Sequence, residues 1–210
     1  MLLRRICCGL LVASLGLPTA ALATAQRVAP AMSADAAAVA QRILRDGDAA
    51  GRPFAIVDKR QGQLVVFDAQ GRLAGVTPVL IGRTVGDHSV AGVGERTQTG
   101  RLLPGDTTTP AGRFSSEPGR NHEGEAIVWL DYDAALAIHR LREGPAALDR
   151  QRRLSTSSAQ DNRASAGCVV VPPAFYAAVV EPLLGRHAGL VYILPEDGIQ
   201  QWHHARVAAR

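Results

Sequence analysis

The hydrophobic pattern changes from helical to strand-like near residue 50. Residues 33–46 (SADAAAVAQRILRD) begin with a capping Ser33 and continue in good helix formers, which predicts a short packing helix. From Pro53 onward, the β-rich runs FAIVDKR and QLVVFD flank Gln61-Gly62, and residues 69–71 then turn the chain into RLAGVTPVLIGR. This pattern predicts a β-meander.

The middle of the chain alternates between irregular and strand-like stretches. Residues 83–108 lack periodicity and are rich in Gly, Thr and charge, which indicates a long loop. TTPAGRF follows with turn residues, and EAIVWLDYDAALAIHR then predicts two strands around a turn at 131–133, with His139 closing the second strand. Residues 140–164 are polar, arginine-rich and irregular.

The last part of the chain predicts one more helix and one more strand. Pro172-Pro173 opens AFYAAVVEPLL, and Pro182 is expected to bend this helix or end it early. The apolar residues of the helix share a face: Phe175, Val179, Val180 and Leu183. A strand, GLVYILP, then precedes a polar tail, QQWHHARVAAR.

The predicted fold class is mainly β, a sandwich or barrel-like domain with one or two packed helices. Strands outnumber helices, and they do not alternate with long helices, so a parallel sheet is not expected. With 47% hydrophobic residues and no internal repeat, the chain can bury one core without disulfides or metal.

The N-terminus has the pattern of a secretory signal peptide. Arg4 and Arg5 precede an uncharged apolar run at 6–17, which is too short to span a bilayer, and small residues suited to cleavage lie before Thr24 and Gln26. We expect removal of residues 1–25 or slightly fewer, with cleavage after Ala23 or Ala25, and export to the periplasm without stable membrane insertion. An uncleaved membrane anchor is the alternative.

Charge argues against a nucleic-acid partner. The net charge of the whole chain is +4, and loss of the two signal-peptide arginines leaves about +2. This excess is too small to favour binding to a polyanion.

The number and position of the cysteines single out Cys168 as a candidate reactive residue. Cys7 and Cys8 leave with the signal peptide, so the mature chain has a single thiol. Exported proteins normally use cysteines in pairs, and an unpaired one suggests a reactive thiol or an intermolecular bridge, whereas the alternative is a buried, inert residue. Ser165-Ala166-Gly167-Cys168 allows a tight turn and close approach of a substrate to backbone N–H groups, and the apolar run after it predicts a buried strand.

His139 is the candidate base for that thiol, because it ends an apolar strand instead of lying in a solvated run. His88 and His122 lie in predicted loops, where histidines are usually solvent-exposed. His203-His204 lack a third ligand nearby, and a metal site is not expected. Thr109 of TTPAGRF is expected to shape the wall of a cleft.

Taken together, these segments resemble a known family. The combination of a signal peptide, the hairpin AIVDKRQGQLVVFD, TTPAGRF, AIHR and SAGC, in this order, is similar to the L,D-transpeptidase catalytic domain (YkuD family) over residues 53–195. The family motif is a histidine followed by Ser/Thr-His-Gly-Cys and, two residues on, Arg or Asn. By this resemblance His139, Ser165, Gly167 and Cys168 occupy motif positions.

The chain departs from the motif at two positions. Ala166 stands where the family has its second histidine, and Val170 where it has Arg or Asn; the gap between His139 and Ser165 is also longer than usual. Because the family's usual base is the first histidine, the first departure leaves the base in place. The second removes a substrate-orienting group, for which Arg163 or Asn162 could substitute. The arginines of residues 140–164, Arg140 among them, could bind stem-peptide carboxylates.

The resemblance implies an enzyme that acts on peptidoglycan stem peptides without metal or cofactor. Cys168 would attack the carbonyl between the third-position diamino acid and the terminal D-alanine, His139 would transfer the protons, and the N–H groups of Gly167 and Cys168 would hold the oxyanion. An acceptor amine from a second stem, a D-amino acid or an envelope protein would then resolve the thioester.

Two alternatives remain open at this stage. With water as acceptor, the same nucleophile would make an L,D-carboxypeptidase or an enzyme that releases peptidoglycan-linked proteins. With a lapsed site, the domain would bind peptidoglycan without reacting. The resulting organisation is a signal peptide (1–25), a helical segment (26–50), an L,D-transpeptidase-like catalytic domain (51–196) and a polar C-terminal tail (197–210).

Overall fold

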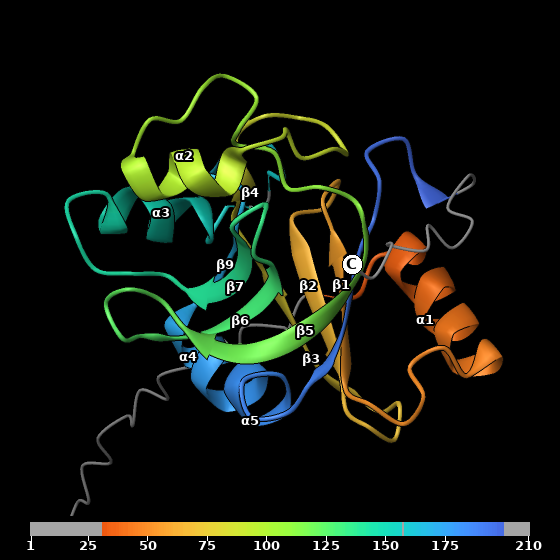
Figure 1. Cartoon of the computed structure of the whole chain (residues 1–210). Coiled ribbons are helices and arrows are strands. Elements are labelled where there is room, and N and C mark those ends of the chain that lie inside the picture. The colour runs from red at the N-terminus through yellow and green to blue at the C-terminus, as the bar shows by residue number, and fades with distance from the viewer. Residues whose placement is uncertain (1–30, 157, 200–210) are drawn as a thin grey trace, which may run out of the picture.

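The computed structural model describes residues 31–156 and 158–199, and within them a mixed eight-stranded sheet organises the chain (Figure 1). The predicted signal peptide (1–25) and most of the predicted tail lie outside the described residues. The strands follow the order β3-β2-β1-β10-β5-β6-β7-β9, while β4 and β8 form a separate pair. Their bounds are β1 Phe54–Asp58, β2 Gln63–Phe67, β3 Leu73–Pro78, β4 Ile81–Gly82, β5 Gly112–Arg120, β6 Ala126–Asp131, β7 Leu136–Arg140, β8 Arg163–Ser165, β9 Val169–Val171 and β10 Gly189–Ile193.

The predicted β-meander is present in β1, β2 and β3. These strands pair antiparallel in sequence order. The β1–β2 turn is closed by the Asp58 carboxylate, whose Oδ1 accepts from the N–H groups of Arg60 (2.9 Å) and Gln61 (3.1 Å). Gly62 then takes a left-handed φ of 59°, which suits a residue without Cβ.

Parallel pairing is where the structure differs from the expectation. In the main sheet β1 pairs parallel with β10, and β7 pairs parallel with β9. The partners lie far apart in sequence, and local periodicity carries no information about such pairs. Both faces of β1 are buried, with Phe54 and Ile56 on one side and Ala55 and Val57 on the other.

The two edges of the sheet are joined into a nearly closed barrel. Leu80 follows edge strand β3, and its N–H and C=O exchange hydrogen bonds of 2.8 Å with Val170 of the other edge strand, β9. The interior holds a cluster of apolar side chains from β1, β2, β6, β7, β9 and β10. The mainly β, barrel-like architecture that the sequence predicts is confirmed.

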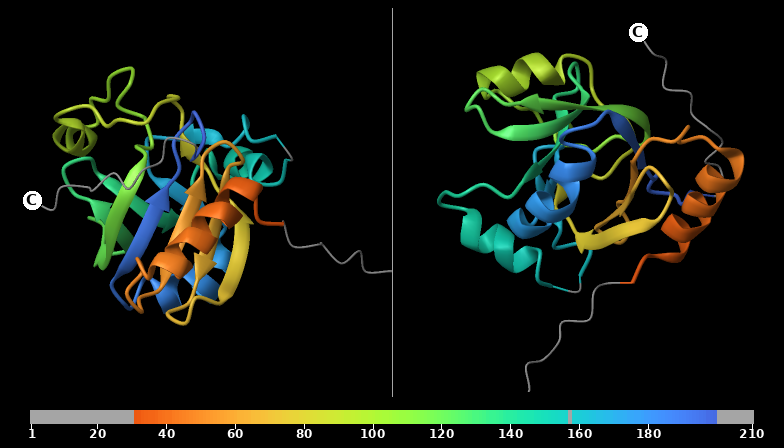
Figure 2. Two further views of the ribbon diagram at one scale, coloured as in Figure 1. Left: turned by 90° about the vertical axis from the view of Figure 1, so that its right-hand side faces the viewer. Right: turned by 90° about the horizontal axis from the view of Figure 1, so that it is seen from below.

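Helix α1 (Ala34–Asp46) covers the outer face of β1, β2 and β10 (Figure 2). Its predicted cap is present, since the Oγ of Ser33 accepts from the N–H of Ala36 (3.1 Å). Apolar residues at helical spacing face the sheet and form a second core cluster with it: Ala36, Val39, Ala40 and Ile43.

The second predicted helix spans 173–183 and packs against the barrel interior. It comprises α4 (Pro173–Phe175), a π-helical stretch (Tyr176–Val180) and α5 (Glu181–Leu183). Pro182 does not end it, because the preceding residues bond with π spacing: the N–H of Glu181 donates to the carbonyl of Tyr176. Tyr176 and Val180 are buried in the interior cluster.

Two short helices lie within the segments expected to be irregular, α2 (Val93–Thr99) and α3 (Ala147–Arg153). Each has seven residues. In α2 the buried residues are Val93 and Gly94 at its start, and none of the α3 residues is buried, so neither helix presents the apolar stripe that predicts a helix. A bidentate ion pair of 2.6 and 2.7 Å between Arg96 of α2 and the buried Asp106 fixes α2.

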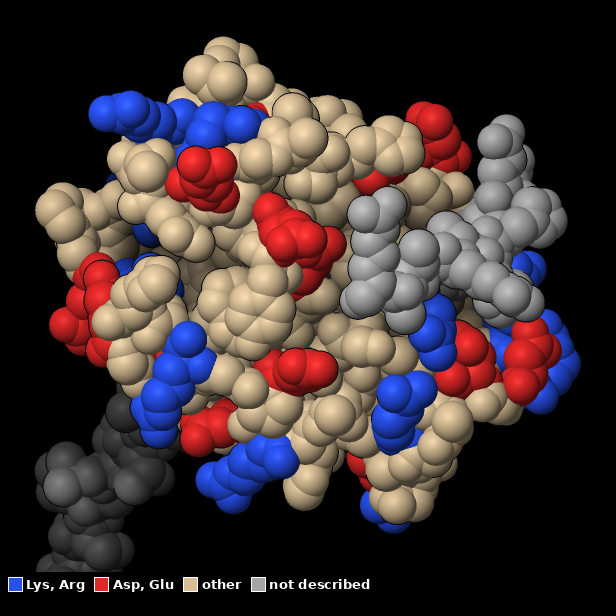
Figure 3. Space-filling view, viewed as in Figure 1, with Lys and Arg blue, Asp and Glu red and all other residues tan. Residues whose placement is uncertain are grey.

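The visible surface agrees with the small net charge. On the face seen in Figure 3, basic and acidic side chains are interspersed over the molecule. Across residues 31–156 and 158–199, no helix is long and apolar enough to cross a membrane.

Candidate active site

Strands β7 and β9 bring the two predicted catalytic residues onto one face of the sheet. In their parallel register Ile138 pairs with Val169 and His139 with Val170. Ile138 and Val169 point into the barrel interior, and side chains alternate along a strand. His139 therefore points outward on the same side as Val170. Cys168 directly precedes β9 and lies two positions before Val170, so continued alternation would put its side chain on that side as well.

The loop before Cys168 is held by two hydroxyl groups. The Oγ of Ser165 donates to the carbonyl of Cys168 (2.6 Å) and accepts from the N–H of Gly167 (3.1 Å). The Oγ1 of Thr109 donates to the carbonyl of Gly167 (2.6 Å). The peptide groups that precede the thiol are therefore fixed from both sides.

Gly167 is required at its position. Its φ is 127°, which side chains rarely allow, and a Cβ there would lie 3.0 Å from the Thr108 carbonyl oxygen. Its N–H already serves Ser165, so of the two predicted oxyanion donors the N–H of Cys168 is the one we retain.

The Cys168 thiol is only partly accessible, and its Sγ donates to the carbonyl of Ala135 at 3.3 Å. Ala135 itself has a left-handed φ of 49°, which turns this carbonyl toward the thiol. Burial raises the pKa of Cys168, and a backbone contact with Ala137 and the charge of Arg142 offset the rise only in part. The resting group near neutral pH is thus the thiol.

His139 is fixed by the carbonyl of its own neighbour. Its Nδ1 lies 2.8 Å from the carbonyl oxygen of Arg140. A carbonyl oxygen only accepts, so Nδ1 carries the proton and Nε2 remains an acceptor in the neutral ring. Burial lowers the pKa of His139 to about 4; the Arg140 carbonyl opposes this shift, and the charge of Arg142 adds to it.

A neutral thiol and a neutral imidazole therefore form the resting pair. His139 contacts the carbonyl of Arg140 and Cys168 that of Ala135, so each side chain bonds to a backbone carbonyl. A neutral imidazole is a competent base, and the thiol proton must then move as the sulfur attacks.

A carboxylate between two arginines borders this pair. Glu125 lies 3.2 Å from the guanidinium of Arg140 and 2.7 Å from that of Arg142, and it also accepts from Asn121 (2.7 Å). Arg140, a predicted substrate-binding residue, is partly exposed in this arrangement. Arg142 is the charge that acts on both His139 and Cys168.

The other two predicted substrate-binding residues have structural partners. Asn162 is buried, and its Nδ2 donates to the carbonyls of Gly62 (3.1 Å) and Val79 (2.9 Å). The side chain of Arg163 is 11% exposed, and its guanidinium pairs with Glu196 at 2.7 Å. Both side chains are engaged within the protein by these contacts, and substrate binding by them stays a prediction.

Sequence reasoning missed three contributors to the site. The carbonyl of Ala135 gives no signal in sequence, because any residue supplies one. Thr109 was expected only to shape a wall, whereas its hydroxyl holds Gly167. Lys59, which contacts the Thr109 carbonyl, stands out in sequence only as the one lysine of the chain.

A metal centre has no support within residues 31–156 and 158–199, where no group of three or more His, Cys, Asp or Glu side chains could hold an ion. His203-His204 lie outside the described residues. His122 is exposed in the turn between β5 and β6, and His88 lies in the loop after β4.

No family model and no curated protein matches the chain. Among solved structures, the NMR structure of the L,D-transpeptidase catalytic domain from Enterococcus faecium matches 69% of this chain and 98% of its own (18% identity, TM-score 0.36). An L,D-transpeptidase from Xylanimonas cellulosilytica matches 73% and 68% (16% identity, TM-score 0.38). The cell-shape protein Pgp2 from Campylobacter jejuni matches 69% and 47% (13% identity, TM-score 0.43). These likenesses are remote, and several of the matched chains are about twice as long as the region they share with this one.

Proposed function

We propose that this chain is a periplasmic cysteine L,D-transpeptidase that acts on peptidoglycan stem peptides through a thioester on Cys168. One observation carries the proposal. His139 lies on β7, which pairs with β9 directly after Cys168, and the Arg140 carbonyl selects the tautomer in which His139 can act as a base; this geometry supports the proposal. The motif positions of His139, Ser165, Gly167 and Cys168 direct it to this family.

In the first half-reaction, Nε2 of His139 takes the proton of the Cys168 thiol while Sγ attacks the carbonyl between the third-position diamino acid and D-alanine. The oxyanion forms beside the N–H of Cys168. Collapse of the tetrahedral intermediate breaks the C–N bond, and the imidazolium gives its proton to the departing amine of D-alanine. The acyl group remains on sulfur as a thioester.

In the second half-reaction, an acceptor amine attacks the thioester. His139 takes a proton from the attacking nitrogen and returns it to the sulfur as the C–S bond breaks. The product is a 3-3 cross-link, an exchanged D-amino acid or an attached envelope protein, according to the acceptor. This sequence of transfers needs a base that is neutral before each attack, which agrees with the lowered pKa of His139.

Substrate orientation is assigned to the arginines near Glu125. Because Glu125 already neutralises one positive charge, Arg140 and Arg142 together retain the capacity to bind one carboxylate. The side chains of Arg140 and Arg142 are each 39% exposed, so a stem-peptide carboxylate can approach them.

Product analysis tests this function. The exported form, with Cys168→Ala and His139→Ala variants, is incubated with disaccharide-tetrapeptide, and the products are read by mass spectrometry with and without an added D-amino acid. Loss of D-alanine together with dimer or exchanged product, absent with Cys168→Ala, is the expected result. Tripeptide as the sole product would replace the transpeptidase with a hydrolase, and unchanged substrate would contradict both.

A further inference from the structure

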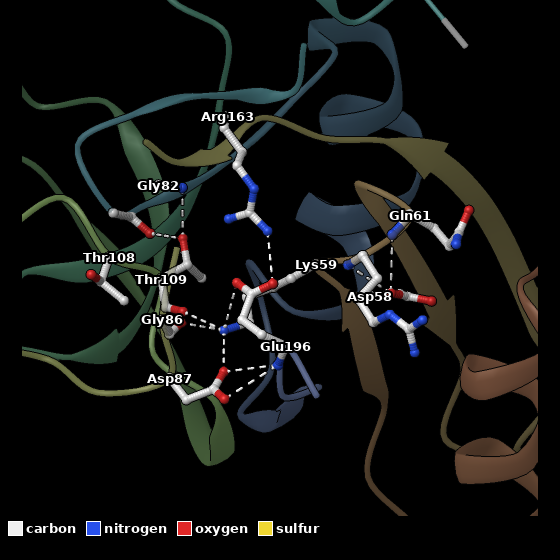
Figure 4. A network of polar contacts seen from close by, with 12 residues as sticks. Asp58, Lys59, Gln61, Gly82, Gly86, Asp87, Thr108, Thr109, Arg163 and Glu196 are labelled. Carbon is white, nitrogen blue, oxygen red and sulfur yellow. Dashed lines mark hydrogen bonds and ion pairs between the residues drawn. The ribbon is translucent and has the colours of Figure 1, made fainter. Parts of the chain in front are cut away.

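Lys59 is a buried cation that none of the catalytic steps uses. It follows β1, and its side chain is 0% exposed. Its ammonium donates to the carbonyl of Gly86 (2.6 Å), to Oδ1 of Asp87 (2.6 Å) and to the carbonyl of Thr109 (3.0 Å) (Figure 4). These three bonds use all three of its hydrogens.

The surrounding charges balance. Oε1 of Glu196 lies 3.3 Å from the Lys59 ammonium, and Oε2 of Glu196 pairs with Arg163 at 2.7 Å. The N–H of Glu196 also donates to Oδ1 of Asp87 (3.0 Å). Two cations and two carboxylates therefore meet where four segments converge, and a buried ion cluster is tolerated only with such pairing.

Thr109 connects this cluster to the nucleophile loop. Its carbonyl accepts from Lys59, while its hydroxyl accepts from the N–H of Gly82 (2.8 Å) and donates to the carbonyl of Gly167 (2.6 Å). Both hydrogen-bonding directions of the hydroxyl are occupied, and Thr109 is buried. Gly82 fits this contact because a Cβ there would lie 2.1 Å from the Thr107 carbonyl oxygen.

From these contacts we infer that Lys59 is a positioning residue for Cys168, which it orients through Thr109 and Gly167. The inference rests on the proposed function, since it assigns Lys59 to the same site. If Thr109 moves, the peptide between Gly167 and Cys168 rotates. That rotation displaces the thiol relative to Nε2 of His139 and turns the N–H that faces the oxyanion. A displacement of about 1 Å can cost about a hundredfold in rate.

Three variants and one control test the connection. Thr109→Val removes the hydroxyl at nearly constant volume, and Thr109→Ser restores it. Lys59→Met combined with Asp87→Asn removes one positive and one negative charge together, so no net charge is left buried. Ser116→Ala is the matched control, because the buried Oγ of Ser116 likewise accepts from a backbone N–H, that of Gly189 (3.1 Å). This contact lies beside the start of β1, whereas Lys59 follows the end of β1.

Two readouts are taken on each folded protein, the rate constant for alkylation of Cys168 by iodoacetamide and the kcat and KM for the disaccharide-tetrapeptide. We expect Thr109→Val and the charge-neutral double variant to lower both the alkylation rate and kcat at least about tenfold with KM changed less than about twofold. Thr109→Ser is expected to recover most of the loss, and Ser116→Ala to leave both readouts within about twofold.

The inference would be overturned if Thr109→Val and the double variant were alkylated at the wild-type rate. It would also be overturned if Ser116→Ala lost as much alkylation rate and kcat as they did, or if Thr109→Ser recovered none of the loss seen in Thr109→Val. The alkylation rate does not depend on the substrate. If the wild-type protein fails to turn over the tetrapeptide while the expected alkylation pattern is found, the proposed function fails and the positioning role of Lys59 stands.

Discussion

At the scale of single residues, the chemistry depends on what backbone groups do to two side chains. His139 and Cys168 could be predicted from sequence, because an unpaired thiol beside a glycine and a histidine closing a strand are both visible there. Their protonation states could not be predicted from sequence, because they depend on the carbonyls of Arg140 and Ala135 and on burial that only the fold creates. The structural contacts of Asn162 could not be predicted either, because tertiary contacts set the direction of its side chain.

The pH dependence of turnover follows from the state of His139. The base must be neutral, and its pKa is lowered to about 4 by burial, so activity is retained as the pH falls through the range where an ordinary histidine gains a proton. We expect the acid limb of kcat/KM to have its midpoint near pH 4. The profile is measured from pH 3.5 to 9 on protein shown to be folded at each pH, and a midpoint near 6.5 would contradict the assignment.

Arg142 acts on both members of the pair, and its charge lowers the pKa of each. Arg142→Gln should therefore raise the pKa of His139 and that of Cys168. The pH dependence of Cys168 alkylation and the acid limb of kcat/KM should both move to higher pH. Arg45→Gln serves as the control, because Arg45 is exposed on α1 and pairs with Asp46. Unchanged midpoints in Arg142→Gln, or equal movement in Arg45→Gln, would show that Arg142 exerts no such effect.

At the scale of elements, local pattern predicts what local interactions build. Helix α1, the meander and β10 arise from capping, alternation and turn residues that are contiguous in sequence. The pairing of β7 with β9 joins residues 31 positions apart in sequence, and the candidate site lies at this pairing. α2 and α3 were missed because neither has an apolar stripe: an ion pair with Asp106 holds α2, and α3 buries none of its residues.

The cap of α1 offers a test at this scale. The Oγ of Ser33 accepts from the N–H of Ala36 and donates to the buried carboxylate of Asp58 at 2.6 Å, so it both starts the helix and ties it to β1. Ser33→Ala should lower the free energy of unfolding by about 1–2 kcal/mol in urea titrations, with Cys168 alkylation unchanged. Ser155→Ala, which removes an exposed hydroxyl bonded to the Gln151 carbonyl, is the control and should cost less. Equal effects of the two substitutions would argue against this role.

At the scale of the whole molecule, the barrel closes where the site lies. Leu80 and Val170 join the two sheet edges two residues from Cys168, and the ion cluster around Lys59 fixes the neighbouring loop. Hydrophobic content and strand number were sufficient to predict a mainly β, barrel-like domain. The closure was not predictable, because it depends on which strands form the edges.

The burial of His139 links the site to the stability of the whole fold. Its pKa is about 4 when folded and about 6.5 when unfolded, so between these values the unfolded chain binds more protons. The stability due to the neutral ring is present above pH 6.5 and is lost as the pH falls toward 4, with an upper bound of about 3 kcal/mol. Urea titrations of wild type and His139→Gln at pH 7 and pH 4.5 check this: the wild type should lose more stability than the variant, and equal losses would contradict the burial of a neutral ring.

In the proposed reaction Cys168, activated by His139, becomes the acyl carrier. The most direct measurement is the mass of the intact protein after a few seconds with excess disaccharide-tetrapeptide, quenched in acid to preserve a thioester. We predict a mass increase equal to the donor minus D-alanine, located on the Cys168 peptide, absent in Cys168→Ala and strongly reduced in His139→Ala. The acyl-carrier role of Cys168 would be contradicted if wild-type protein consumed the donor while Cys168 stayed unmodified, or if the adduct lay on another residue.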